Sequence, residues 1–248
     1  MTKVDDYRNA LRELDDWDGY LRAESGLPGA RANLALAEAA ADEGDEQRFR
    51  HWLTFTADKA PSNTPDEFLA FCGVVGLGRL LAEGSRNMLD TLRECASDSR
   101  WRTREGVAIA LQRWGDADMD GLIDEMGSWG KGNLLEQRAA AAALCEPRLL
   151  KNPEQVERVL KIVNDITASI ENLSDRKSDE FIALHKGLGY CWSVAVAANP
   201  AAGKPLMEKW FASADKDIRW MMKENLKKER LVRMDAAWVQ SALQQIGA

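Results

Sequence analysis

Residues 98–105 read DSRWRTRE, and residues 217–224 read DIRWMMKE. Both stretches fit one pattern, D-x-R-W-x-x-(R/K)-E, and each opens an apolar run with helical spacing. The first run continues as GVAIALQRWGD over residues 106–116. A pattern that recurs at the start of helical segments is typical of a chain built from repeated helical units.

Weaker copies of the pattern occur elsewhere in the chain. Residues 133–144 read NLLEQRAAAAAL, residues 179–189 read DEFIALHKGLG, and residues 66–76 read DEFLAFCGVVG. The corresponding positions in the five stretches are Cys72, Arg104, Arg138, His185 and Lys223. They are separated by 32, 34, 47 and 38 residues. Periods of this length are typical of stacked helix pairs, which predicts an α-solenoid.

The composition also favours helices over strands. The 248 residues include 35 Ala and 28 Leu but only 11 Val and 8 Ile, and Val and Ile are the residues that favour strands. We therefore predict an all-α fold in which residues 1–248 form a single solenoid domain of about five to six helix pairs. Residues 1–60 are expected to be N-terminal capping helices, and residues 61–248 the recognisable repeats.

One segment is expected at the centre of this fold. Residues 66–81 are apolar on most sides, which predicts a buried helix. The stretch GVVGLG at residues 73–78 is similar to a phosphate-binding glycine run, but no strand precedes it. The predicted role of these glycines is close packing between helices.

The run D-x5-R-E-x2-A-x2-L-x3-GD at residues 98–116 resembles the second half of a HEAT repeat. Asp98 and Arg104 match the aspartate and arginine of that family, Asp217 and Lys223 match with lysine substituted, and Arg138 matches loosely. The resemblance implies an α-solenoid in which the aspartate lies at a helix N-terminus and the arginine reaches that carboxylate or its counterpart in the next repeat. Four residues are accordingly predicted to be structural repeat positions: Asp98, Arg104, Arg138 and Asp217.

Several classes of function are disfavoured. The net charge of −7 argues against a protein whose whole surface binds nucleic acid. The first residues lack the features of a signal peptide, and no apolar run is long enough for a transmembrane helix, so we expect a cytoplasmic protein. His51 and His185 are far apart, no CxxC spacing occurs, and no nucleophile motif is present. We therefore assign no catalytic residue, metal or cofactor.

Tryptophans and basic residues supply the candidate binding surface. Trp101 and Trp220 occupy the same position of the repeated pattern beside arginines, where they could form one ring-stacking surface. Residues 204–233 carry nine basic and five acidic side chains, and a basic stripe with helical spacing runs through them. The candidate binding residues are Arg100, Trp101, Trp210, Arg219, Trp220, Lys223, Lys227 and Arg230. The alternative is a solvated helix face that Glu224 and Glu229 help to balance.

Two functions from different classes follow. The first is a non-catalytic scaffold that binds a protein or peptide partner, since solenoids present extended surfaces and Trp and Arg are favoured at binding hot spots. The second is a DNA-binding repair protein resembling the HEAT-like alkylpurine DNA glycosylases, with the C-terminal basic face on nucleic acid. No tryptophan followed by an aspartate occurs at the distance before Arg104 or Arg138 that this family requires, and WGKGN at residues 129–133 has asparagine instead. No catalytic residue is therefore transferred from that family.

Overall fold

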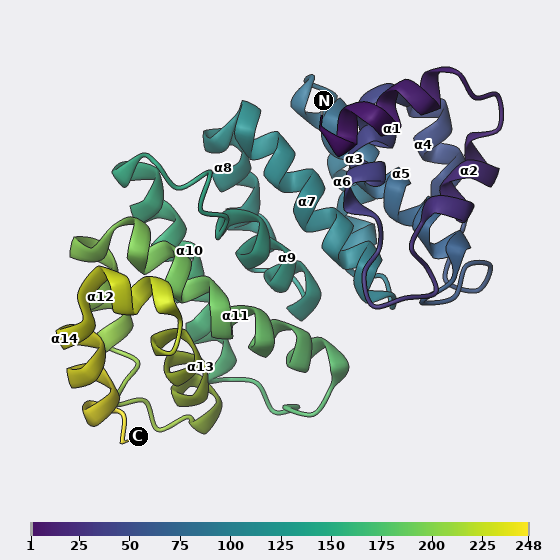
Figure 1. The fold of residues 1–248 in the computed structure, drawn as a ribbon. Coiled ribbons are helices and arrows are strands. Elements are labelled where there is room, and N and C mark those ends of the chain that lie inside the picture. The colour runs from purple at the N-terminus through teal and green to yellow at the C-terminus, as the bar shows by residue number, and fades with distance from the viewer. Residues whose placement is uncertain (1, 248) are drawn as a thin grey trace. The chain divides into compact units, whose positions relative to one another are not determined.

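The structure is a computed structural model, and it describes residues 2–247. The regular structure of these residues consists of fourteen α-helices without strands, which confirms the predicted all-α class (Figure 1). Contacts between Cα atoms divide the chain into two compact units. We call residues 1–117 the N-terminal unit and residues 118–248 the C-terminal unit.

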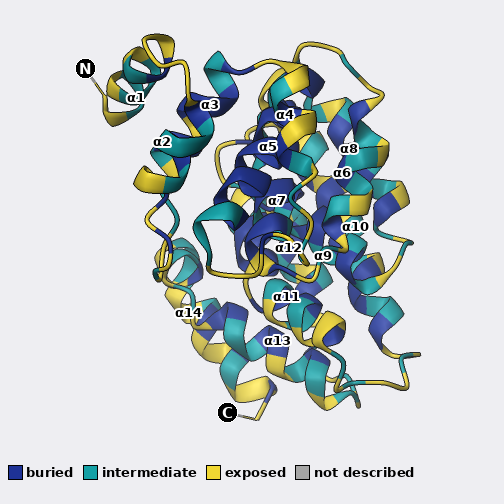
Figure 2. Cartoon of the chain, turned by 90° about the vertical axis from the view of Figure 1, so that its right-hand side faces the viewer, coloured by how far each residue is buried: buried dark blue, intermediate teal, exposed yellow. Residues whose placement is uncertain are grey.

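The N-terminal unit is built around one buried helix, α5. Fourteen of the eighteen residues of α5 are buried, which confirms the central helix predicted for residues 66–81 (Figure 2). Helices α2, α3, α4, α6 and α7 all pack against it. The helices of this unit are α1 (Lys3–Arg12), α2 (Trp17–Glu24), α3 (Leu34–Glu43), α4 (Glu46–Leu53), α5 (Pro65–Ala82), α6 (Met88–Ala96) and α7 (Trp101–Ala117).

Glycines let the neighbours of α5 approach closely. A Cβ atom added at Gly78 would lie 2.4 Å from the Cα atom of Ala110 on α7. A Cβ added at Gly76 would lie 2.4 Å from ring carbons of Phe49 on α4. Both distances are shorter than van der Waals contact allows. A larger side chain at either glycine would therefore require the neighbouring helix to shift. They confirm the prediction that the glycines of residues 73–78 serve helix packing.

The C-terminal unit is likewise built around one helix, α11, which packs against α9, α10, α12, α13 and α14. By length and composition α11 is the one helix in the described part of the chain that could cross a membrane, and 56% of the relevant stretch is buried in the protein. The helices of this unit are α8 (Met119–Trp129), α9 (Leu134–Leu144), α10 (Pro153–Ile170), α11 (Asp179–Ala198), α12 (Pro200–Glu208), α13 (Lys216–Leu226) and α14 (Glu229–Gln245).

The central helices of the two units have packing neighbours at corresponding positions along the chain. Helix α5 packs against α3, α4, α6 and α7, and α11 packs against α9, α10, α12 and α13. Both central helices follow a hydroxyl N-cap, Thr64 before α5 and Ser178 before α11. Nearly the same sequence follows near the start of each helix, as DEFLA at residues 66–70 after Pro65 in α5 and as DEFIA at residues 179–183 from the first residue of α11. The weak sequence copies therefore mark equivalent helices.

The first copy of the D-x-R-W pattern surrounds the start of α7. The Asp98 carboxylate accepts a hydrogen bond from the backbone N–H of Arg100 at 2.7 Å and also binds the Arg100 guanidinium at 2.7 Å. Arg104 donates to the backbone carbonyl of Asp98 at 2.6 Å. The predicted helix-start role of Asp98 fits this geometry, although the Arg104 bond described here is to the carbonyl oxygen.

The second copy lies differently on its helix. The N-cap of α13 is Asp215, and Asp217 lies in the first turn, where it binds Arg176 at 3.3 Å. Arg219 donates to the Ser213 carbonyl at 2.5 Å, six residues back, as Arg104 does to Asp98.

The residue equivalent to Arg104 by this bond is therefore Arg219, and not Lys223 as the pattern predicts. Arg104 and Arg219 lie 115 residues apart, whereas the two pattern copies lie 119 residues apart. The difference of four residues is about one helical turn. Lys223 donates instead to the Gly247 carbonyl at 3.0 Å. Arg138 lies half-buried on α9.

Candidate functional site

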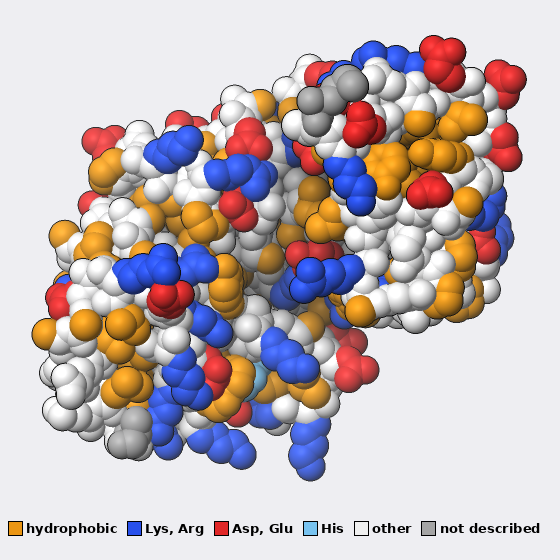
Figure 3. Space-filling view, viewed as in Figure 1, with side chains coloured by type: hydrophobic (Ala, Val, Ile, Leu, Met, Phe, Trp, Pro, Cys, Tyr) orange, Lys and Arg blue, Asp and Glu red, His pale blue; other side chains and the backbone are white. Residues whose placement is uncertain are grey.

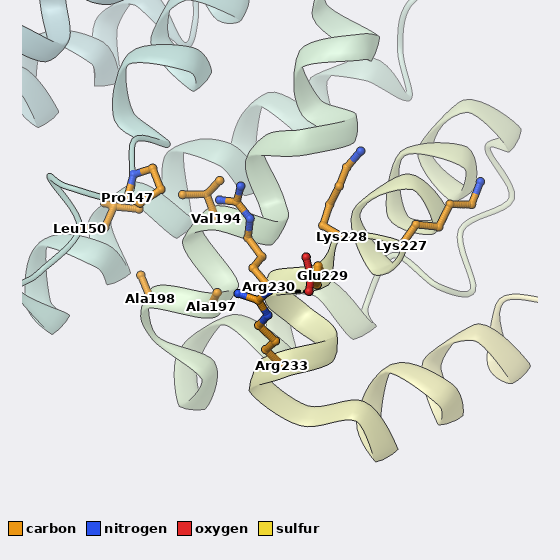
Figure 4. Close-up of a pocket in the computed structure, with 10 residues that line it drawn as sticks. All are labelled: Pro147, Leu150, Val194, Ala197, Ala198, Lys227, Lys228, Glu229, Arg230 and Arg233. Carbon is orange, nitrogen blue, oxygen red and sulfur yellow. Dashed lines mark hydrogen bonds and ion pairs between the residues drawn. The ribbon is translucent and has the colours of Figure 1, made fainter.

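A surface groove of about 730 Å³ lies in the C-terminal unit (Figure 4). One side of it is apolar and the other is basic. The apolar side chains are Pro147, Leu150, Val194, Ala197 and Ala198. The charged side chains are Lys227, Lys228, Glu229, Arg230 and Arg233. Two of the predicted binding residues, Lys227 and Arg230, thus line the same groove.

The apolar side is formed by the segment between α9 and α10 and by the C-terminal half of α11. Leu150 and Val194 are largely buried and leave only a small surface to the groove. In the same part of the unit, Cys145 and Cys191 are buried free thiols. A hydrogen bond to Cys191 and burial raise the pKa of the Cys145 thiol well above its usual range. This thiol is uncharged at neutral pH, so it adds no negative charge near the groove.

The basic side extends from the end of α13 into the first turn of α14. Lys227 pairs with Glu224, and Arg233 pairs with Glu229, each at 2.5 Å. Lys228 and Arg230 have no carboxylate within ion-pair distance in the described part of the chain. This wall therefore has two positive charges in excess. In Figure 3, basic side chains gather over the C-terminal unit with apolar side chains between them.

Tyr190 on α11 holds the two unpaired cations. The Arg230 guanidinium lies 4.6 Å from the centre of the Tyr190 ring and donates a hydrogen bond to its hydroxyl. The Lys228 ammonium lies 5.9 Å from the same ring centre. Figure 4 shows the Arg230 side chain extending toward Val194 on the apolar side, whereas Lys227 points away. Arg230 is thus oriented toward the groove without its charge being neutralised.

Asn225 fixes the basic wall relative to α11. Its side chain is fully buried, and its amide oxygen accepts a hydrogen bond from the backbone N–H of Ser193 at 2.8 Å. Its amide nitrogen donates to the carbonyls of Leu188 and Met221, both at 2.7 Å. One side chain therefore joins the backbones of α11 and α13, and it lies two residues before Lys227.

Replacing Asn225 by leucine is expected to lower the free energy of unfolding of the C-terminal unit by about 2–3 kcal/mol. Leucine fills a similar volume but leaves buried backbone groups without their partner. Urea denaturation followed by circular dichroism measures the change. The matched control is Asn172→Leu at an exposed position, which is expected to change stability by less than about 0.5 kcal/mol. Equal midpoints for the two variants would contradict the role given to Asn225.

Three other predicted binding residues are engaged within the protein. Arg100 is only 4% exposed, and it donates to the carbonyls of Phe55 and Ala60. The indole N–H of Trp210 donates to Asn164 at 3.2 Å. Arg219 is held by the carbonyl bond described above. The structure therefore gives Arg100 a buried structural role, because loop carbonyls that no sequence pattern reveals surround it.

Trp101 and Trp220, for which we predicted one shared ring-stacking surface, are both exposed but belong to different units. Trp101 is 50% exposed, and the Arg102 guanidinium lies 4.4 Å from its ring centre. Trp220 is 40% exposed and stacks on His185, with ring centres 4.2 Å apart and planes inclined by 24°. Burial lowers the pKa of His185, whose Nε2 lies 3.3 Å from the Asp217 carbonyl. His185 is thus a neutral support for Trp220.

A smaller pocket of about 290 Å³ lies in the N-terminal unit. Its His51 Nε2 lies 3.1 Å from the Asp18 carboxylate, which also accepts a hydrogen bond from the Trp52 indole at 2.7 Å. The lining residues include no Ser, Thr or Cys that this histidine would activate. Within residues 2–247, no three His, Cys, Asp or Glu side chains are grouped closely enough to hold a metal ion.

Comparison with known proteins finds no matching family model, no matching curated protein and no matching solved structure. The function is therefore argued from the groove and its surroundings.

Proposed function

We propose that the protein is a non-catalytic helical-repeat binding protein whose C-terminal unit holds an acidic segment of a partner protein. The observation that carries this proposal is the groove with two unpaired cations, Lys228 and Arg230, opposite an apolar side. Carboxylates of the segment would bind the cations, and its aliphatic side chains would cover Pro147 and Ala198, the exposed members of the apolar side. Such a surface gives both electrostatic attraction and burial of apolar area.

The apolar side of the groove favours a peptide over a nucleic-acid backbone. Tight binding of a duplex rests on many cations that each neutralise a phosphate. Here Glu224 and Glu229 already pair with two of the four basic side chains. A segment that alternates acidic and aliphatic residues matches both sides of the groove.

The repeat architecture is part of the same proposal. In the C-terminal unit, α11 packs against α9 and α13, and α10 packs against α8 and α12. This order, in which alternate helices pack on one another, supports a stack of helix pairs of the HEAT-like type. An extended surface along such a stack suits a bound peptide segment.

Arg230→Met is expected to weaken peptide binding about tenfold or more, because a hydrogen bond to a charged group contributes about 1.5–3 kcal/mol. The probe is a fluorescein-labelled peptide of three Glu-Leu-Asp repeats, titrated by fluorescence anisotropy against the full chain. The control peptide has Gln and Asn in place of Glu and Asp. The control variant is Arg158→Met, whose guanidinium pairs with Asp120 and Asp124 outside the groove.

The proposal requires that the acidic peptide binds, that the amide peptide does not, and that only Arg230→Met weakens binding. Failure of the acidic peptide to bind at low salt would overturn it. Tighter binding of a short DNA duplex, with a steep dependence on salt, would overturn it in favour of a DNA-binding protein.

A further inference from the structure

Trp220 on α13 lies flat against α11, over the glycine that precedes Tyr190. Its inner face stacks on His185, and a Cβ atom added at Gly189 would lie 3.1 Å from one of its ring carbons. The absence of a side chain at Gly189 therefore lets the indole rest on the helix. With its inner face covered in this way, the 40% of Trp220 that is exposed belongs mainly to the outer face and edge of the ring.

The ring is held in place by a column of stacked groups. Behind His185 lies Phe181, with ring centres 5.4 Å apart, and behind Phe181 lies the Arg176 guanidinium at 5.2 Å. Arg176 is itself fixed by Asp215 at 2.7 Å. A ring that is already oriented loses little conformational entropy when a ligand stacks on it.

The edge of the Trp220 indole is also open. Its N–H has no acceptor within hydrogen-bond distance in the part of the chain that the structure describes. Five other tryptophans donate this bond to a side chain: Trp52, Trp129, Trp192, Trp210 and Trp238. Trp220 thus offers both an exposed face and an unused donor to a ligand.

The position of Trp220 sets its distance from the groove. Gly189, which the ring covers, is next to Tyr190, which holds Arg230, and Val194 and Ala198 line the groove further along α11. Around the axis of α11, Val194 and Ala198 project about 140° and 180° away from Gly189, so the ring adjoins the groove through Tyr190 and its partner Arg230. An extended peptide joins the ring to this guanidinium with a few residues.

We propose that the outer face of Trp220 is a second subsite, which stacks an aromatic side chain of the same acidic peptide. The aromatic residue lies a few residues from the carboxylate that binds Arg230. This inference rests on the proposed function and adds to it a preference for acidic peptides that carry an aromatic residue. The aromatic residue is chosen over a nucleobase because the ring adjoins the Tyr190-bound Arg230, whose proposed ligand is a peptide carboxylate.

The test compares two labelled peptides that carry the three Glu-Leu-Asp repeats. One begins Phe-Gly-Ser and the other Ala-Gly-Ser. An aromatic pair contributes enough to make the Phe peptide bind the wild-type chain about three- to tenfold more tightly. Trp220→Ala is expected to remove this difference, so that the two peptides bind the variant with equal affinity. The matched control, Trp101→Ala, removes the other exposed pattern tryptophan and is expected to preserve the difference.

The outcomes separate the two proposals. If neither peptide binds, the proposed function fails and the subsite fails with it. If both peptides bind the wild-type chain equally well, only the Trp220 subsite is overturned. Displacement of the Phe peptide from wild type, but not of the Ala peptide, by a short single-stranded oligothymidylate would assign the face to a nucleobase and also overturn it.

A second measurement keeps the inference testable if Trp220→Ala does not fold. A para-fluorophenylalanine placed at the aromatic position reports its surroundings through its fluorine chemical shift. Stacking on an indole moves the resonance upfield when the peptide binds the wild-type chain. A bound resonance at the shift of the free peptide would overturn the subsite.

Discussion

Replacing Arg102 by methionine is expected to lower the free energy of unfolding of the N-terminal unit by about 3–5 kcal/mol. Glu67 is fully buried, and its carboxylate lies 3.1 Å from the Arg102 guanidinium, whose side chain is only 5% exposed. Methionine fills much of the space but leaves the carboxylate without a counter-charge. Removing one partner of a buried ion pair costs far more than the pair itself contributes.

The expected loss is large because Glu67 has few other partners. One carboxylate oxygen accepts a hydrogen bond from the Asn63 backbone at 2.6 Å, and the other, Oε1, has no partner among the described residues. Arg102 also donates to the Gly29 carbonyl at 2.7 Å, a bond that the variant loses as well. Since natural domains are stable by only about 5–15 kcal/mol, the N-terminal unit of the variant is expected to be close to unfolding.

Thermal and urea denaturation of the full chain measure the loss. The double variant Arg102→Met with Glu67→Leu is expected to recover most of it, because neither charge is then buried. Arg50→Met, which breaks an exposed ion pair with Glu46, is the matched control and should cost about 0.5 kcal/mol or less. A double variant no more stable than Arg102→Met would show that the loss has another origin.

The Gly78→Ala variant is expected to lower the free energy of unfolding by about 3 kcal/mol. The added Cβ would lie 2.4 Å from the Cα of Ala110 and 2.7 Å from its carbonyl oxygen. These atoms belong to the backbone of α7, so a side-chain rotation cannot relieve the clash. Helices α5 and α7 must separate, which disturbs the buried contact between them.

The control for this prediction is a glycine with open space around it. An added Cβ at Gly127 in α8 would meet no atom within 4 Å. Gly127→Ala is therefore expected to stabilise the protein by about 0.5–1 kcal/mol, because alanine is the better helix former. Thermal unfolding of the two variants, followed by circular dichroism, measures their melting temperatures and tests this prediction. A melting temperature of Gly78→Ala equal to or higher than that of Gly127→Ala would mean that Gly78 does not limit the approach of the helices.

The helical class and the central helix were predictable because their signals are local. Composition and spacing identify α5, and the glycines of residues 73–78 indicate close packing. The sequence alone could not predict which residues of the two D-x-R-W copies are structurally equivalent. Positions one turn apart face the same side of a helix, so a match of sequence letters does not exclude a structural shift of one turn. Only the carbonyl bonds of Arg104 and Arg219 reveal the shift.

Only part of the candidate site was predictable, because helical spacing identifies a stripe of basic residues but not the contacts that each of them makes. The helical spacing of the basic stripe identified Lys227 and Arg230, but it joined them to Arg219 and Lys223, which bind backbone carbonyls. Tyr190 was missed because nothing near it in sequence marks it, and its partner Arg230 lies 40 residues further along. The apolar side, with Leu150, comes from a segment between helices whose contribution depends on tertiary packing.

The order of neighbours shared by α3–α7 and α9–α13 has an evolutionary consequence. Corresponding neighbours around α5 and α11, together with the DEFLA and DEFIA sequences near their starts, are what an in-frame duplication of a gene segment would leave. After such an event both copies inherit the same scaffold, while their surfaces and core polar groups diverge independently.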